Sequence, residues 1–218
     1  MGSRLREAIA RNLRKPEATI IGRLVKKIAL EKMNCFLELE AVRLCDIQPD
    51  HQVLEVGFGP GIGIQATYHI VKDGNGEVYG IDFSEEMVLS ATRLLRKGIG
   101  EGKVSLINAE AADLSCFQSN TFDRVFHCNC YYFWPDMTKA TNELHRVMKP
   151  GATMVTTMNP ERLKISQSRG FFKYGNPDQR PYIKALQSSG FCGVQLKTLK
   201  HESSGASFDA IFAKKPGF

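Results

Sequence analysis

The sequence lacks two features that define large protein classes, namely a long apolar run and cysteines paired at metal-binding spacing. No stretch approaches the roughly 20 apolar residues needed to span a bilayer, so we expect no membrane insertion. The six cysteines are scattered, and the only close pair, Cys128 and Cys130, has no second Cys or His pair to complete a zinc site. We therefore expect reduced thiols and no bound metal.

Targeting signals are also missing. The chain opens without a signal peptide, and Arg6 stands where a myristoylation signal requires Ser or Thr. The arginine-rich start has one feature of a mitochondrial presequence, but Glu7 and the scarcity of serine argue against that interpretation. We expect a cytoplasmic protein.

Neither sign of charge is in large excess. The sequence contains 29 Lys and Arg and 23 Asp and Glu, which gives a net charge of +6. Much of the excess lies in the first 32 residues. Such a basic arm could contact an acidic partner or a membrane surface, but a solvated helical face is the simpler interpretation. With 218 residues and 43% apolar composition, the chain suits one domain. We expect a helical extension over residues 1–48, which could cover a ligand cleft, and an α/β domain over residues 49–218.

What the sequence does contain is a short apolar run, Val53 to Val56, that leads into glycines at every second position from Gly57 to Gly63. The run is typical of a buried parallel strand, and residues 64–71 have the pattern of a helix. Glycines at a strand-to-helix turn allow positive φ angles and let a ligand lie against the main chain at the helix N-terminus. This predicts a nucleotide-sized binding site; a tight turn without a ligand is the alternative.

The spacing of the glycines bears on which nucleotide binds. A dinucleotide site has the pattern Gly-x-Gly-x-x-Gly, whereas Gly57, Gly59 and Gly61 follow Gly-x-Gly-x-Gly, and Ile62 occupies the third dinucleotide position. Glu55 adds a carboxylate beside the loop, which favours a cationic ligand over a phosphate. The segment resembles motif I of the class I S-adenosylmethionine-dependent methyltransferases.

A second carboxylate supports a nucleoside ligand. Asp82 ends the next predicted strand, 21 residues after Gly61, where a carboxylate can accept both ribose hydroxyls. The alternative is that Asp82 caps the following helix, which Ser84 could also do. Phe83 is placed either to pack on an adenine ring or to fill the core.

The resemblance also indicates which residues would bind the adenine ring. In the family, the acceptor for the adenine amino group follows the third strand, usually in a Gly-Asp-Ala sequence. This chain has Ala109-Glu110-Ala111 there. The resemblance therefore assigns Glu110 to the amino group and the Ala111 N–H to the ring, with Asp113 as a substitute acceptor.

The segment from Phe122 through Trp134-Pro135-Asp136 to Leu144-His-Arg-Val-Met-Lys-Pro-Gly is similar to the methyltransferases of menaquinone and ubiquinone biosynthesis. The resemblance covers about residues 50 to 157. It implies a three-layer, Rossmann-like α/β fold with a seven-stranded sheet in the order 3-2-1-4-5-7-6, in which only the last strand is antiparallel. It also implies S-adenosylmethionine as cofactor and S-adenosylhomocysteine as product. The predicted cofactor contacts are Glu55, Gly57, Phe58, Gly59, Gly61, Asp82, Phe83, Glu110, Ala111 and Cys128.

Apolar periodicity and turn residues predict the remaining elements. Helices are expected over residues 1–15, 17–46, 84–97, 138–148 and 181–189. Strands are expected over residues 77–83, 104–107, 122–129, 152–157, 194–199 and 207–213. Residues 159–179 have no clear period, and we expect them to line or cover the pocket for the methyl acceptor.

Methyl transfer from a sulfonium is an in-line displacement that needs a positioned nucleophile, a desolvated site and only sometimes a base. The sequence therefore identifies no catalytic residue. Asn129, Tyr132 and Tyr174 are candidates for the acceptor pocket. His127 lies within an apolar strand, where a core histidine is the simpler interpretation than a base.

Three functions stay open. The first is methylation of a small molecule in a closed pocket, by a monomer or homodimer. The second is methylation of a protein, which an open groove would favour, and the third is a non-catalytic cofactor-binding module. Nucleic acid is disfavoured, because the Asn/Asp-Pro-Pro-Tyr/Phe motif of exocyclic-amine methyltransferases is replaced by Asn129-Cys130-Tyr131-Tyr132. A dehydrogenase conflicts with the glycine spacing, and only Cys128 and Cys130 suggest arsenite methylation.

Overall fold

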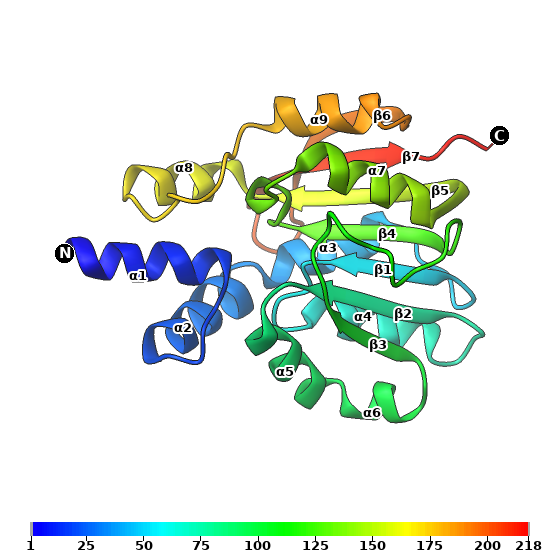
Figure 1. The fold of residues 1–218 in the computed structure, drawn as a ribbon, viewed down its shortest axis with the longest axis horizontal. Helices are drawn as coiled ribbons and strands as arrows, with labels where there is room; N and C mark the ends of the chain where they lie inside the picture. Colours follow the sequence, from blue (N-terminus) through cyan, green and yellow to red (C-terminus); the bar gives the residue numbers. More distant parts are fainter. Residues whose placement is uncertain (1, 218) are drawn as a thin grey trace.

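The computed structural model describes residues 2–217, in which a seven-stranded sheet carries helices on both faces (Figure 1). The strands are β1 Gln52–Val56, β2 Glu77–Asp82, β3 Val104–Asn108, β4 Phe122–Cys128, β5 Met148–Met158, β6 Cys192–Lys200 and β7 Ser207–Lys214. Their order is β3-β2-β1-β4-β5-β7-β6. The first five strands pair in parallel, and β7 runs antiparallel to both β5 and β6. The predicted strand order and the single reversed strand are confirmed.

Alternate residues of the central strands supply two cores, one on each face of the sheet. Val53 belongs to the core formed with α3 Cys35–Leu44, α4 Ile62–Val71, α5 Glu85–Leu94 and α6 Arg96–Gly100. Leu54 belongs to the core formed with α7 Met137–Val147 and α9 Gln179–Ser188. Both side chains are fully buried. Because helices cover both faces of β1, apolar side chains occur at consecutive positions, Val53 and Leu54, and not only at every second one.

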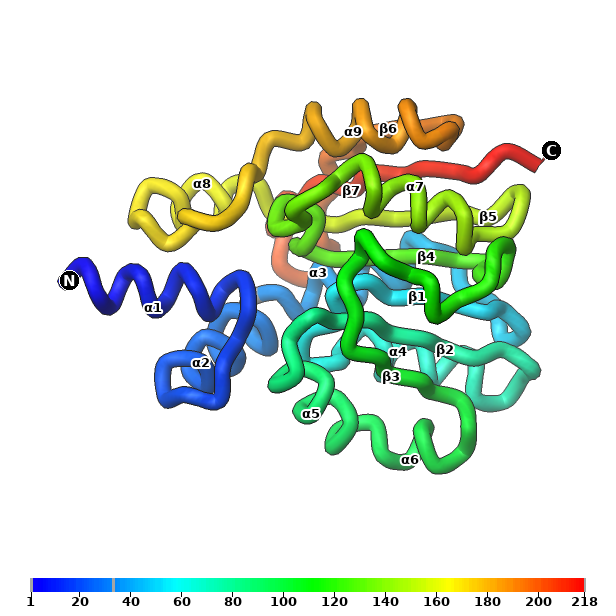
Figure 2. The backbone as a smooth tube through the Cα atoms, in the orientation of Figure 1, coloured from blue at the N-terminus to red at the C-terminus, as the bar shows by residue number. Residues whose placement is uncertain are grey.

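The chain before β1 contains α1 Ser3–Arg14, α2 Ile20–Val25, the π-helix η1 Lys26–Met33 and α3. α1 ends shortly before Pro16, and the Thr19 side chain caps α2 by accepting a backbone N–H. Leu37 of α3 is fully buried, and its carbonyl accepts the Thr157 hydroxyl of β5 at 3.0 Å, so α3 packs on the sheet. α1 and α2 instead lie together at one end of the sheet, near α8 (Figures 1 and 2).

The prediction of one helix over residues 84–97 is wrong. α5 ends at Leu94, and α6 begins at Arg96. Gly98 lies inside α6 and does not close the preceding helix. Its lack of a side chain permits close packing, since an added Cβ would lie 2.6 Å from Cγ2 of Val104.

Residues 159–179 contain a helix that the pattern did not predict, α8 Pro160–Ser168. The Asn159 side chain caps it by accepting the Arg162 N–H at 3.0 Å, and proline occupies the first turn. α8 buries only Leu163, which leaves no apolar periodicity to detect. Two smaller differences are the 3-10 helix η2 Tyr131–Phe133 after β4, and Met148, which begins β5 and does not end a helix.

Candidate active site

The turn between β1 and α4 carries three glycines with positive φ angles, 71° at Gly57, 52° at Gly59 and 93° at Gly61. Residues with a Cβ rarely adopt this left-handed region of the backbone, so glycine is favoured at all three positions. The space around them differs. An added Cβ at Gly57 would lie 3.0 Å from Cβ of Cys130, and one at Gly61 would lie 3.0 Å from Cβ of Ala91. At Gly59 nothing lies within 4 Å, so this stretch of main chain faces open space.

Asp82, the last residue of β2, lies against this turn. Its Oδ2 accepts the N–H of Gly59 at 2.9 Å, and its Oδ1 accepts the N–H of Ser84 at 2.8 Å. Asp82 therefore orders the turn before α5 and does not cap the helix itself. The residue is 6% exposed. This burial raises the pKa of Asp82 to about 6, although the two N–H groups and Lys15 oppose the shift.

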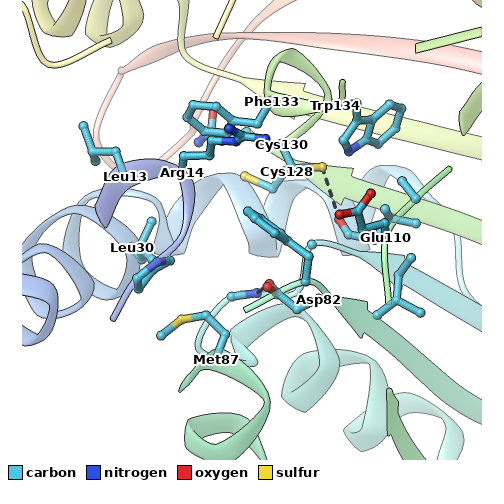
Figure 3. A pocket seen from close by; sticks show the side chains of 18 of the residues that line it. Leu13, Arg14, Leu30, Asp82, Met87, Glu110, Cys128, Cys130, Phe133 and Trp134 are labelled. Carbon is cyan, nitrogen blue, oxygen red and sulfur yellow. Dashed lines mark hydrogen bonds between the residues drawn. The ribbon is translucent and has the colours of Figure 1, made fainter. Parts of the chain in front are cut away.

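A cavity opens beside Asp82 and the glycine turn (Figure 3). Its wall includes the predicted cofactor residues Gly57, Gly59, Asp82, Phe83, Glu110, Ala111 and Cys128. Glu55, Phe58 and Gly61 do not line this cavity. Phe58 is fully buried and packs over Gly80, where an added Cβ would lie 2.6 Å from its ring. Phe83 is half-buried and belongs to the cavity wall, where the Lys15 ammonium lies 5.4 Å from its ring centroid.

A second cavity adjoins the first. The residues that line both are Leu13, Leu30, Asn34, Asn129 and Phe133. The second cavity extends toward α8, where Arg162, Leu163 and Phe172 form its wall. Asn129 follows β4 with a φ angle of 50°, so this left-handed residue turns the chain where the two cavities meet.

The three residues predicted for the acceptor pocket do not all lie in one place. Asn129 and Tyr132 line the second cavity, and Tyr174 lines neither cavity. The Tyr174 hydroxyl donates to the Glu7 carboxylate, and Lys173 pairs with the same carboxylate at 2.7 Å. These contacts tie the segment after α8 to α1.

His127 is fully buried in β4 and lies within a polar network. Its Nε2 lies 2.7 Å from the Tyr182 hydroxyl and 2.8 Å from the Thr156 hydroxyl, and its Nδ1 lies 3.4 Å from the Cys130 thiol. Burial lowers the pKa of His127 to about 3. The imidazole is therefore neutral, and His127 is a hydrogen-bonded core residue.

Glu55 and Glu38 form a buried pair of carboxyl groups. Glu55 is fully buried under the first turn of α4, where an added Cβ at Gly63 would lie 2.5 Å from its Oε1. Glu38 of α3 is 7% exposed and lines the first cavity. Burial raises the pKa of Glu38 to about 7, and burial together with the charge of Glu38 raises the pKa of Glu55 well above its usual range. The pair therefore holds a proton near neutral pH.

Several residues of the N-terminal segment line the first cavity although no sequence pattern predicted them. They are Leu13, Arg14, Pro16, Leu30, Asn34 and Glu38. The helical spacing and basic charge of residues 1–48 indicate surface helices and do not identify which side chains face a ligand. One signal was present, since Glu38 interrupts the apolar sequence Phe36-Leu37-Glu38-Leu39.

The sheet order, the glycine turn after β1 and the carboxylate at the end of β2 define the class I, Rossmann-like methyltransferase fold. A SAM dependent methyltransferase from Aquifex aeolicus has the same fold, with a TM-score of 0.66 and 21% sequence identity. The match covers 88% of this chain and 97% of that chain.

Sequence comparison identifies the family. Residues 53–151 match the methyltransferase domain family. The uncharacterized methyltransferase YdaC of Bacillus subtilis (strain 168) is 32% identical over 169 residues, which are 75% of this chain and 83% of that protein. A demethylmenaquinone methyltransferase of Bacillus cereus (strain B4264) is 31% identical over 135 residues, which are 62% of this chain but only 56% of that enzyme. The chain belongs to the S-adenosylmethionine-dependent methyltransferases.

Proposed function

We propose that the protein transfers the methyl group of S-adenosylmethionine to a small-molecule acceptor held in the second cavity. The adjacency of the two cavities carries this proposal, because Asn129 and Phe133 belong to both walls. An acceptor atom in the second cavity would thus lie next to a cofactor bound in the first. Exclusion of water favours displacement at a sulfonium carbon.

The residues of the first cavity fit the cofactor. Asp82 presents buried carboxylate oxygens for the ribose hydroxyls, and Phe83 and Glu110 are assigned to the adenine face and its amino group. The open space at Gly59 lets a ligand approach the main chain. When bound, S-adenosylmethionine supplies the electrophilic methyl group. The aromatic ring of Phe133, which belongs to both cavity walls, suits its positive sulfur.

We assign a small molecule as the acceptor because segments of the chain cover the second cavity. Leu13 of α1, Leu30 of η1 and Leu163 of α8 all line it. We assign residues 1–48 and 159–179 to this cover, with residues 49–218 as the methyltransferase domain. The demethylmenaquinone methyltransferases among the relatives act, by name, on a small molecule, which supports the same class of acceptor here.

Within residues 2–217, no helix combines the length and the apolar character needed to cross a bilayer. We also propose that the protein works in the cytoplasm. All six cysteines are free thiols, which fits a reducing compartment.

Calorimetric titration with S-adenosylmethionine and NADH, followed by isotope transfer, tests the proposal. The protein is incubated with S-adenosylmethionine labelled in its methyl group and with small-molecule and protein fractions of a cell extract. Label in the small-molecule fraction alone is the expected result. Label in protein would reassign the acceptor. Binding of NADH without binding of S-adenosylmethionine would overturn the cofactor assignment.

A further inference from the structure

Two charged side chains from the N-terminal segment line the first cavity without a partner of opposite charge. Glu38 is 93% buried, and no described residue donates a well-formed hydrogen bond to its Oε2. Arg14, at the end of α1, has a buried Nε with no acceptor among residues 2–217. No described carboxylate lies within ion-pair distance of its guanidinium. Buried polar atoms are normally hydrogen-bonded, so the Glu38 carboxyl and the Arg14 Nε both indicate a ligand.

Both groups lie at one end of this cavity. The Glu38 carboxyl neighbours the Cys128 thiol, at the end of β4, and both residues line the cavity. Figure 3 shows Arg14 on the side of Cys128 and Phe133 and away from Asp82. The residues assigned to adenosine occupy the other end, so the Arg14 end remains for the part of the cofactor beyond its sulfur.

We propose that Glu38 and Arg14 bind the zwitterionic amino-acid end of the cofactor, with Glu38 accepting from the α-ammonium and Arg14 donating to the α-carboxylate. This assignment rests on the proposed function. The two side chains do not pair with each other, which leaves room for a ligand that carries both charges. A guanidinium fork matches a carboxylate, and a buried carboxylate matches an ammonium.

Glu55 completes the arrangement from behind. Its carboxyl group neighbours Glu38 but does not line the cavity. A proton on Glu55 leaves the negative charge of the pair on Glu38, where the ligand ammonium lies. The acidic residue of the glycine-loop motif thus acts through Glu38 and does not contact the ligand itself.

Binding titrations with three nucleosides distinguish the contact to the α-ammonium from the contact to the α-carboxylate. S-adenosylhomocysteine carries both charged groups, its decarboxylated form S-adenosyl-3-thiopropylamine carries only the amine, and 5′-methylthioadenosine carries neither. Glu38→Gln should weaken binding of the first two by about 10- to 100-fold, the usual effect of losing a charged hydrogen bond, and leave 5′-methylthioadenosine within twofold. Arg14→Gln should weaken only S-adenosylhomocysteine.

Matched controls are Arg11→Gln, an exposed arginine of the same helix as Arg14, and Glu40→Gln, a buried glutamate of α3 that pairs with Arg43 and does not line the cavity. Equal weakening of all three nucleosides, or no weakening, would overturn the assignment. Selective loss in one variant alone would overturn the role of the other residue. If the wild-type protein binds none of the nucleosides, the proposed function itself fails.

Discussion

The carboxylate of Asp82 accepts the backbone N–H of Gly59 at 2.9 Å, although 23 residues separate them. This bond joins the end of β2 to the glycine turn after β1 and holds one carboxylate oxygen in place before any ligand binds. A second N–H, from Ser84, holds the other oxygen. The Asp82 carboxylate is therefore oriented by backbone donors from two different turns.

Asp82→Ala should weaken S-adenosylhomocysteine binding by about 1–3 kcal/mol, because the ribose hydroxyls lose a charged acceptor. Calorimetric Kd values for wild type and variant measure the effect. Glu85→Gln, an exposed residue at the start of α5, is the matched control and should bind normally. An unchanged Kd in Asp82→Ala would remove Asp82 from the cofactor site.

Gly59→Ala should weaken cofactor binding, because its methyl group enters the cavity, and should lower stability only by the cost of backbone strain. Gly102→Ala is a close control, since Gly102 has a φ angle of 70°, nothing within 4 Å of an added Cβ, and no place in either cavity wall. Both changes carry a similar backbone strain of about 1 kcal/mol. Thermal unfolding and nucleoside titration should show equal losses of stability but a loss of binding only in Gly59→Ala. Equal binding in the two variants would contradict the assignment.

Binding of S-adenosylhomocysteine should weaken as the pH falls from 8 to 6. The pKa of Glu38 is raised to about 7, so acid neutralises the carboxylate that pairs with the ligand ammonium. The affinity should fall by up to about tenfold per pH unit below that pKa. Asp82, whose pKa is raised to about 6, affects every adenosine ligand, so 5′-methylthioadenosine serves as the reference. Identical pH profiles for the two nucleosides would contradict the role of Glu38.

The stability of the unliganded protein should fall as the pH rises from 5 to 8. Burial and the charge of Glu38 raise the folded-state pKa of Glu55, so the folded protein keeps a proton that the unfolded chain has lost. A raised carboxyl pKa stabilises the fold at low pH. As the pH rises, the free energy of unfolding then falls by at most about 1.4 kcal/mol per pH unit.

Glu55→Gln removes this titration, so its Tm should rise relative to wild type as the pH increases across this range. Thermal unfolding at several pH values measures the difference. The exposed Glu202→Gln is the control and should follow the wild-type curve. A constant difference in Tm between Glu55→Gln and wild type would show that the pair is ionised in the fold.

Tyr182→Phe should cost about 1 kcal/mol of stability and leave nucleoside binding unchanged. The Tyr182 hydroxyl lies 2.7 Å from Nε2 of His127 and 3.0 Å from the Thr156 hydroxyl, and these three buried residues line neither cavity. Chemical denaturation measures the loss of this net hydrogen bond. A changed Kd for S-adenosylhomocysteine would instead connect the network to the site.

Local patterns predicted much of the fold. The apolar run of β1, the glycines after it and the turns between later strands act within a few residues of the chain, and the structure confirms the elements that they indicate. The failures have the same cause. α8 buries one residue and has no period to detect, and Gly98 is required by contact with Val104 and not by a helix end.

The sequence by itself determined that a strand, a left-handed glycine turn and a helix follow one another, and that Asp82 ends the next strand, because backbone preferences and apolar periodicity are local. The tertiary structure decided that Glu55 is buried behind Glu38, and that Arg14 reaches the cavity from α1. It also decided that two cavities meet at Asn129. Burial, charge pairing and cavity shape depend on which distant segments pack together, and no short stretch of sequence contains that information.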